Sequence, residues 1–216
     1  MSVEASWQKI RNGISLPSLL LFFILSIALV SPGFSQPRDS VVAQKLIQER
    51  LERVRADSLN PVLRYELANA FHDAGKKHEA LLHYDKAVAL KPDHLEALVN
   101  RGVVLNELGR IDDAIASFER ALSVNPRDPK AMLNLGNSLY ALQRYDDAMA
   151  RYKLAASVDS TFVEAYYYIG IAFADAGIYR EAIREWQRIL EIAPGSEVAR
   201  NAKDNIDVLM VFLSGK

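Results

Sequence analysis

The four histidines are the side chains best suited to metal binding or proton transfer near neutral pH, and they fall within one short stretch of the sequence. No two of them show the HExxH or i, i+4 spacing that places a zinc-binding pair on one helix face. We therefore interpret three of them as solvated surface residues and the fourth as a loop residue. No metal site and no cofactor is predicted. The four residues are His72, His78, His83 and His94.

Two pairs of adjacent carboxylates, Asp112–Asp113 and Asp146–Asp147, could in principle perform acid–base chemistry. Both pairs recur at the same interval in the chain, and negative charge is favoured in the first turn of a helix. Helix starts therefore explain them better than catalysis. The sequence also contains no GxSxG motif and no phosphate-binding P-loop. No catalytic residue is predicted, and we expect that the protein is not an enzyme.

The composition is that of a folded protein. Half of the 216 residues are hydrophobic and a quarter are charged. The formal net charge of −1 provides no basic excess, so nucleic acid is not an expected partner. The chain has no cysteine, which excludes disulfides, thiolate zinc sites and a lipoprotein cysteine.

Residues 1–35 differ from the rest of the chain and predict a signal peptide or an N-terminal membrane anchor. Lys9 and Arg11 precede an apolar run over residues 14–30, in which Ser26 is the one polar residue after position 18. The run is intermediate between a signal-peptide core and a full membrane span. Cleavage after Ser35, a retained anchor and a buried helix are three alternatives.

The charge placement gives the same topology for a cleaved or a retained leader. Positive residues before the apolar run keep the N-terminus inside and send the remainder across the membrane. We therefore expect a periplasmic or extracytoplasmic protein, either secreted or anchored to the inner membrane. Contact with the membrane is expected only through residues 14–30, and only if these are uncleaved.

A repeat of 34 residues covers most of the remaining chain, beginning at residues 61, 95, 129 and 163. Small residues recur at the eighth and twentieth positions, where two helices could approach closely. An aromatic residue recurs at the twenty-fourth position, and proline at the thirty-second in three of the four repeats. The small and aromatic positions are Ala68, Gly102, Gly136 and Gly170; Ala80, Ala114, Ala148 and Ala182; and Tyr84, Phe118, Tyr152 and Trp186.

This period and pattern resemble the tetratricopeptide-repeat (TPR) family. The resemblance implies an all-α fold, a right-handed superhelix of antiparallel helix pairs with a capping helix at each end. It divides the chain into the leader (1–35), an N-terminal helix (38–58), four repeats (61–94, 95–128, 129–162 and 163–196) and a C-terminal capping helix (197–216). The N-terminal helix could instead be a coiled-coil arm, but it is too short to establish one.

Turn and cap residues agree with these helices. Glycine follows the first helix of three repeats, where a left-handed C-terminal cap is expected, and Gln143 takes this position in the third. Asn60 and Asp128 each precede a proline suited to the first turn of a helix. The spacing of Thr161 with Glu164, and of Asp93 with Glu96, predicts two capping boxes.

In TPR proteins the first helices of the repeats line a concave groove, so the resemblance places the second, sixth, ninth and thirteenth positions of each repeat at a partner-binding surface. Asparagine amides there can pair with the backbone of an extended peptide. Acids outnumber the single cation, which favours a neutral-to-basic segment. The candidate binding residues are Asn69, Asn100, Asn134, Asn137, Glu66, Glu96, Glu107, Lys130, Tyr168 and Asp175.

The two-carboxylate clamp of TPR co-chaperones, which holds a C-terminal carboxylate, is not expected. Asn69, Asn100 and Lys130 match its pattern, but Tyr65 and Asn134 stand where cations are required. The loss of two cations removes most of the charge-assisted binding.

We therefore predict a non-catalytic scaffold that binds an extended segment of a partner protein, in a bacterial cell envelope. The alternative is an N-terminally anchored receptor or co-chaperone on an organelle membrane, with its repeats facing the cytosol. An enzyme with a repeat appendage is disfavoured because the repeats, caps and leader account for the chain.

Overall fold

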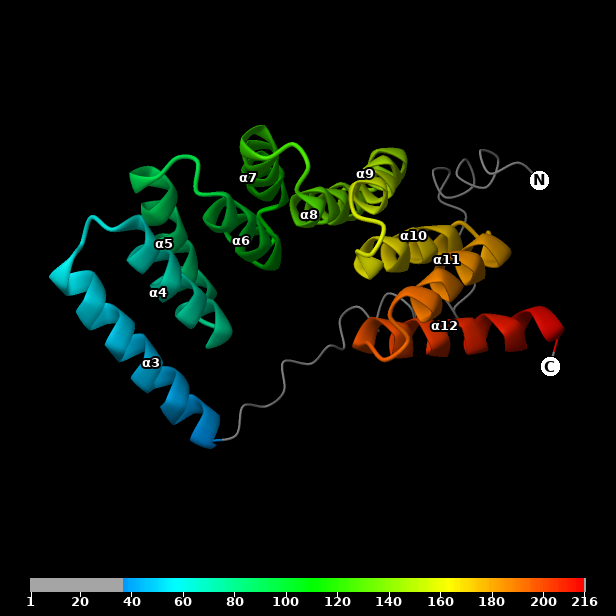
Figure 1. The fold of residues 1–216 in the computed structure, drawn as a ribbon, viewed down its shortest axis with the longest axis horizontal. Helices are drawn as coiled ribbons and strands as arrows, with labels where there is room; N and C mark the ends of the chain where they lie inside the picture. Colours follow the sequence, from blue (N-terminus) through cyan, green and yellow to red (C-terminus); the bar gives the residue numbers. More distant parts are fainter. Residues whose placement is uncertain (1–36, 216) are drawn as a thin grey trace. The chain divides into compact units, whose positions relative to one another are not determined.

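The computed structural model describes residues 37–215, and these form ten α-helices and no strand (Figure 1). The predicted all-α class is confirmed. The leader expected over residues 1–35 lies outside the described residues, and none of the helices within them has the length and apolarity needed to cross a membrane. The helices are α3 (Pro37–Ala56), α4 (Pro61–Asp73), α5 (Lys77–Leu90), α6 (Leu95–Glu107), α7 (Ile111–Val124), α8 (Pro129–Ala141), α9 (Tyr145–Val158), α10 (Val163–Asp175), α11 (Tyr179–Ile192) and α12 (Glu197–Ser214).

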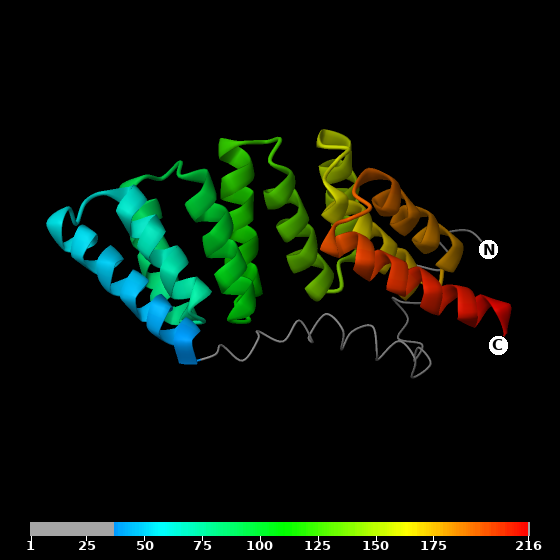
Figure 2. The same cartoon turned by 60° about the horizontal axis from the view of Figure 1, so that its bottom comes forward.

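The described chain forms two compact units, residues 37–142 and residues 143–215, and each is described by itself. In the first unit, α3 packs on α4, α4 pairs with α5, and α6 pairs with α7. The second helix of each pair also contacts the first helix of the next, α5 with α6 and α7 with α8 (Figure 2). In the second unit, α10 pairs with α11, α9 packs on α10, and α12 packs on α11.

The helix pairs approach closely at the eighth position of the repeat. A Cβ atom added at Gly102 would lie 2.5 Å from Cε1 of Phe118, whose ring is fully buried. A Cβ atom at Gly170 would meet the indole of Trp186 in the same way. Trp186 is also fully buried and donates a hydrogen bond from Nε1 to the Tyr167 carbonyl at 3.1 Å. Glycine is therefore required here to give space to the aromatic residue of the second helix.

The turns after the first helices adopt the left-handed backbone that the sequence predicted. Gly75, Gly109 and Gly177 have φ of 72°, 75° and 74°. Gln143 has φ of 61° and is the one non-glycine residue with positive φ in the described part of the chain. This conformation costs a residue with a Cβ more than it costs glycine.

Three of the helix starts have the expected side-chain caps. Asn60 accepts from the Val62 and Leu63 amides, Asp128 from the Ala131 amide, and Ser196 from the Ala199 amide. The two capping-box predictions were wrong. α6 begins after His94 and α10 after Phe162, so each cap falls one residue later than expected, and neither side chain makes a cap bond.

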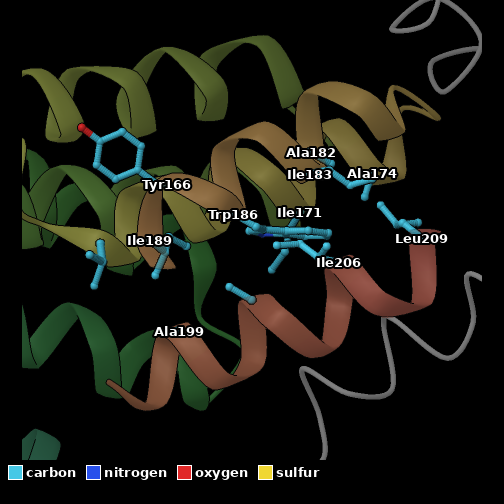
Figure 3. Packing of buried hydrophobic residues seen from close by; sticks show 12 residues of the cluster. Tyr166, Ile171, Ala174, Ala182, Ile183, Trp186, Ile189, Ala199, Ile206 and Leu209 are labelled. Carbon is cyan, nitrogen blue, oxygen red and sulfur yellow. The ribbon is translucent and has the colours of Figure 1, made fainter. Parts of the chain in front are cut away.

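Each unit ends in a helix that covers apolar residues. On α3, Ile47 and Val54 are buried. On α12, the stripe Ala199, Ala202, Ile206 and Leu209 packs with Trp186 of α11 (Figure 3). Leu213 was expected to continue this stripe but is 47% exposed, because the buried face of α12 ends at Leu209.

Candidate functional site: the first-helix stripe

We use "first-helix stripe" for the second, sixth, ninth and thirteenth positions of α4, α6 and α8, all within residues 61–142. Most of its side chains are half-buried, which keeps their positions defined while leaving atoms accessible. The twelve residues are Val62, Glu66, Asn69 and Asp73; Glu96, Asn100, Val103 and Glu107; and Lys130, Asn134, Asn137 and Ala141.

Asn69 of α4 and Asn100 of α6 are hydrogen-bonded to each other. Nδ2 of Asn100 donates to Oδ1 of Asn69 at 3.1 Å and to the Tyr65 hydroxyl at 3.4 Å. The Tyr84 hydroxyl, from the second helix of the first repeat, donates to the same Asn69 oxygen at 2.5 Å. The oxygen of Asn69 and the nitrogen of Asn100 are thus engaged within the protein.

The Tyr84 hydroxyl was missed by the sequence analysis, which treated the twenty-fourth position as a core filler. The ring is fully buried, and burial raises the pKa of Tyr84 well above its usual range. The hydroxyl therefore remains a neutral donor at any physiological pH and holds the Asn69 amide in one orientation. The recurring aromatic residue gave no signal for this role, because only tyrosine carries the hydroxyl.

The third repeat contributes polar groups of a different kind. Nδ2 of Asn134 donates to the carbonyl of Lys130 at 2.9 Å, within the same helix, and Lys130 is exposed. Asn137 is half-buried and engaged in an interaction of its own. A link not foreseen from the sequence joins α6 to α8: Asn106 donates to the Ser138 hydroxyl at 2.8 Å, and the Ser138 hydroxyl and Asn106 Oδ1 lie 3.1 Å apart.

Two acids of the stripe are ion-paired, so its negative charge is smaller than the sequence suggested. Oε2 of Glu66 lies 2.9 Å from Arg50 and 2.7 Å from Arg53, both on α3. Glu107 lies 3.1 Å from Lys77. These cations come from other helices and were invisible to an analysis of each first helix alone.

Further contacts involve histidines. Nε2 of His72 lies 3.1 Å from Glu107, and Nδ1 of His94 lies 3.1 Å from Glu96. Glu96 remains largely exposed, with 65% of its side chain accessible. Asp73 is exposed. Asp73 and Glu96 are therefore the acids most accessible to a ligand.

The corresponding positions of the fourth repeat lie in the second unit. Tyr168 is half-buried and stacks on Tyr152, with ring centroids 5.7 Å apart. Asp175 is half-buried, and its charge adds to burial in raising the pKa of Tyr145. Ile171 was expected at the surface but is buried in the apolar cluster of this unit.

The interpretation of the histidines was wrong for two of them. His83 and His94 are both buried, and Nδ1 of His83 has no hydrogen-bond partner. Burial, together with the charges of Arg64 and Lys86, lowers the pKa of His83 from 6.5 to about 4, so the imidazole is neutral at physiological pH. Within residues 37–215, no three potential metal ligands lie together.

The paired helices, the close glycine–aromatic contacts and the left-handed turns define a helical repeat protein whose first helices carry a polar surface. Models of the tetratricopeptide repeat match residues 65–122, 107–161 and 163–196, which is more than half of the chain. The chain belongs to the tetratricopeptide-repeat family, whose fold is a scaffold for protein–protein interaction. The comparison with curated proteins found no match.

Several solved structures share this fold. A crystal structure of MamA is 25% identical with a TM-score of 0.61, covering 68% of this chain and 85% of its own. TTC0263, a TPR protein from Thermus thermophilus, is 21% identical with a TM-score of 0.66, covering 78% and 96%. YrrB, described as a TPR protein with an unusual peptide-binding site, is 19% identical with a TM-score of 0.59, covering 94% and 100%.

Proposed function

We propose that this protein is a non-catalytic scaffold that holds an extended segment of a partner protein along the first-helix stripe of residues 61–142. The observation that carries the proposal is the pairing of Asn69 with Asn100. Because Oδ1 of Asn69 and Nδ2 of Asn100 are engaged internally, Asn69 retains an amide donor and Asn100 retains a carbonyl acceptor. A peptide group needs one acceptor and one donor, so the two amides complement it.

The two remaining atoms are accessible as well as complementary. Among the described residues, His83 Nδ1 is the one buried polar side-chain atom without a partner, so neither Asn69 Nδ2 nor Asn100 Oδ1 is buried and unsatisfied. Recognition through the backbone accepts many side chains, which suits a scaffold that binds an extended segment. The peptide-binding site reported for YrrB supports a role of this kind in a protein of the same fold.

The proposed ligand is neutral to moderately basic. Asp73 and Glu96 are accessible on the stripe, whereas Glu66 and Glu107 are already paired with cations of the protein. Attraction by two accessible acids favours association with a basic segment and weakens as salt is added. A strongly basic ligand would need more unpaired acids than the stripe provides.

For the location, we propose export to a bacterial cell envelope. The support is the sequence of residues 1–35, with positive charge before a long apolar run. An organelle receptor facing the cytosol is the second candidate. N-terminal sequencing of the mature protein separates cleavage after Ser35 from a retained anchor, and a C-terminal reporter active only in the cytoplasm would contradict export.

A photo-crosslinking experiment tests the binding surface. A photoreactive amino acid is introduced into the full chain at Asp73, on the stripe, or at Lys86, an exposed residue of the second helix α5. We expect a specific partner to be captured from Asp73 and not from Lys86, and capture to fall when Asn69 and Asn100 are both replaced by alanine. Equal capture from both positions, or capture unaffected by the two alanines, would place the binding face elsewhere.

A further inference from the structure

The C-terminal end of α12 carries a cluster of exposed apolar side chains that no packing in the second unit explains. We call residues 208–213 the α12 tip. Its exposed members are accessible to between 47% and 57%, whereas the earlier part of α12 buries its apolar residues on α11. In Figures 1 and 2 the red end of α12 extends beyond α11. The exposed residues are Val208, Met210, Val211, Phe212 and Leu213.

These side chains surround the helix. At about 100° per residue, five apolar residues in a run of six leave no side of the helix without one. Their one aromatic contact is between Phe212 and Tyr179, with ring centroids 5.2 Å apart and the rings edge to face. A groove on another protein covers one face of a helix, so it would leave part of the tip in water. An apolar solvent covers every face.

The length of the tip also fits one environment. Six helical residues span about 9 Å, which is within the ~5–10 Å to which interfacial helices enter the boundary between lipid headgroups and acyl chains. A bilayer core of about 30 Å would need a much longer segment. After Asp207 the sequence has no acidic residue, so nothing in the tip opposes contact with an anionic lipid surface.

We propose that the α12 tip inserts into the surface of a lipid bilayer. This membrane contact is separate from residues 14–30 and does not depend on whether the leader is cleaved. It would hold the second unit at the membrane surface by its C-terminal helix. Apolar contact is the main attraction, so binding should persist on uncharged lipid and at high salt.

The absence of cysteine in the chain permits a direct test. Met210→Cys in the full chain is labelled with an environment-sensitive fluorophore and mixed with phosphatidylcholine vesicles, with or without phosphatidylglycerol. The matched control carries the label at Lys203→Cys, an exposed position about two turns earlier in the same helix. A third protein combines Met210→Cys with Val211→Asp and Phe212→Asp, and circular dichroism verifies its helix content.

We expect vesicles to shift the emission of the Met210→Cys label to shorter wavelength, to leave the Lys203→Cys label unchanged, and to have no effect in the aspartate variant. If the protein co-sediments with vesicles while the Met210→Cys label stays in water, the leader alone binds membrane and the proposal is wrong. A shift that occurs without vesicles and grows with protein concentration would also overturn it, because a second copy of the chain would then cover the tip.

Discussion

The imidazole of His83 stacks on the ring of Phe71, with centroids 5.4 Å apart and planes within 14°. This contact joins α5 to α4 inside the first repeat, and it leaves Nδ1 of His83 buried without a hydrogen bond. The protein therefore accommodates a neutral imidazole at this position and disfavours the charged form.

The first prediction follows from the lowered pKa of His83. Because its folded-state pKa of about 4 lies below the unfolded value of 6.5, the unfolded chain binds this proton more readily between these values. Stability should thus be highest above pH 6.5 and should fall as the pH is lowered toward 4, by on the order of 1–3 kcal/mol from this group. Urea unfolding at several pH values measures the change.

The matched variants isolate the contribution of His83. His83→Phe should reduce the loss of stability on acidification, whereas His78→Phe, at an exposed position, should leave it as in the parent protein. Other groups also titrate in this window, so the comparison is between the variants and not with a pH-independent baseline. Identical pH profiles for His83→Phe and the parent would contradict the neutral buried imidazole.

The second prediction concerns Gly102. A side chain at this position would overlap the buried Phe118 ring, so Gly102→Leu should destabilise the first unit by on the order of 1–3 kcal/mol or more. Gly195→Ala is the control, because a Cβ there meets nothing within 4 Å and the backbone φ is not positive. Thermal unfolding followed by circular dichroism should show a lower midpoint for Gly102→Leu alone. An unchanged midpoint would reject the close helix approach.

The third prediction is that apolar burial, and not the ion pairs with Glu66, holds α3 on α4. Partly exposed ion pairs contribute about 0–1 kcal/mol, whereas truncating a buried isoleucine costs roughly 2–5 kcal/mol. Ile47→Ala should therefore expose the arginines of α3 to trypsin, while Glu66→Gln and the exposed-site control Val42→Ala should have little effect. Faster cleavage of Glu66→Gln than of Ile47→Ala would reverse this ranking.

The fourth prediction concerns α12 as a cover for the second unit. Deleting residues 197–216 removes Ala202, Ile206 and Leu209 from the apolar cluster around Trp186. Because an uncovered repeat face is apolar, the truncated protein should unfold at a lower temperature and aggregate. Light scattering during heating is the measurement. Solubility and stability equal to those of the full chain would show that α12 does not act as a cap.

The sequence predicted the helical fold well because the repeat imposes the same local requirements several times. Position fifteen needs a left-handed backbone, and even Gln143, which lacks the freedom of glycine, adopts it. Position eight needs a small residue beside an aromatic ring, as at Gly102. By contrast, the two capping boxes failed because the spacing of Thr161 and Glu164 does not determine at which residue the helix begins.

The candidate site was predicted less well, since its chemistry depends on contacts between helices. Nothing in the pattern of α4 indicates that Arg50 and Arg53 of α3 pair with Glu66. The amides of Asn69 and Asn100 were expected to be available for a ligand, but half of each is used inside the protein. His83 was assigned to the surface because helical periodicity alone does not show which face of α5 packs on Phe71.

The contacts of Gly102 with Phe118 and of Gly170 with Trp186 also constrain how such repeats can diverge. Two sites sixteen residues apart share one volume, so a mutation at either site alters what the other tolerates. A smaller ring at position twenty-four would have to appear before a methyl group could be accepted at position eight. Among related sequences, these two positions should therefore covary within each repeat, more strongly than either does with its neighbours in the chain.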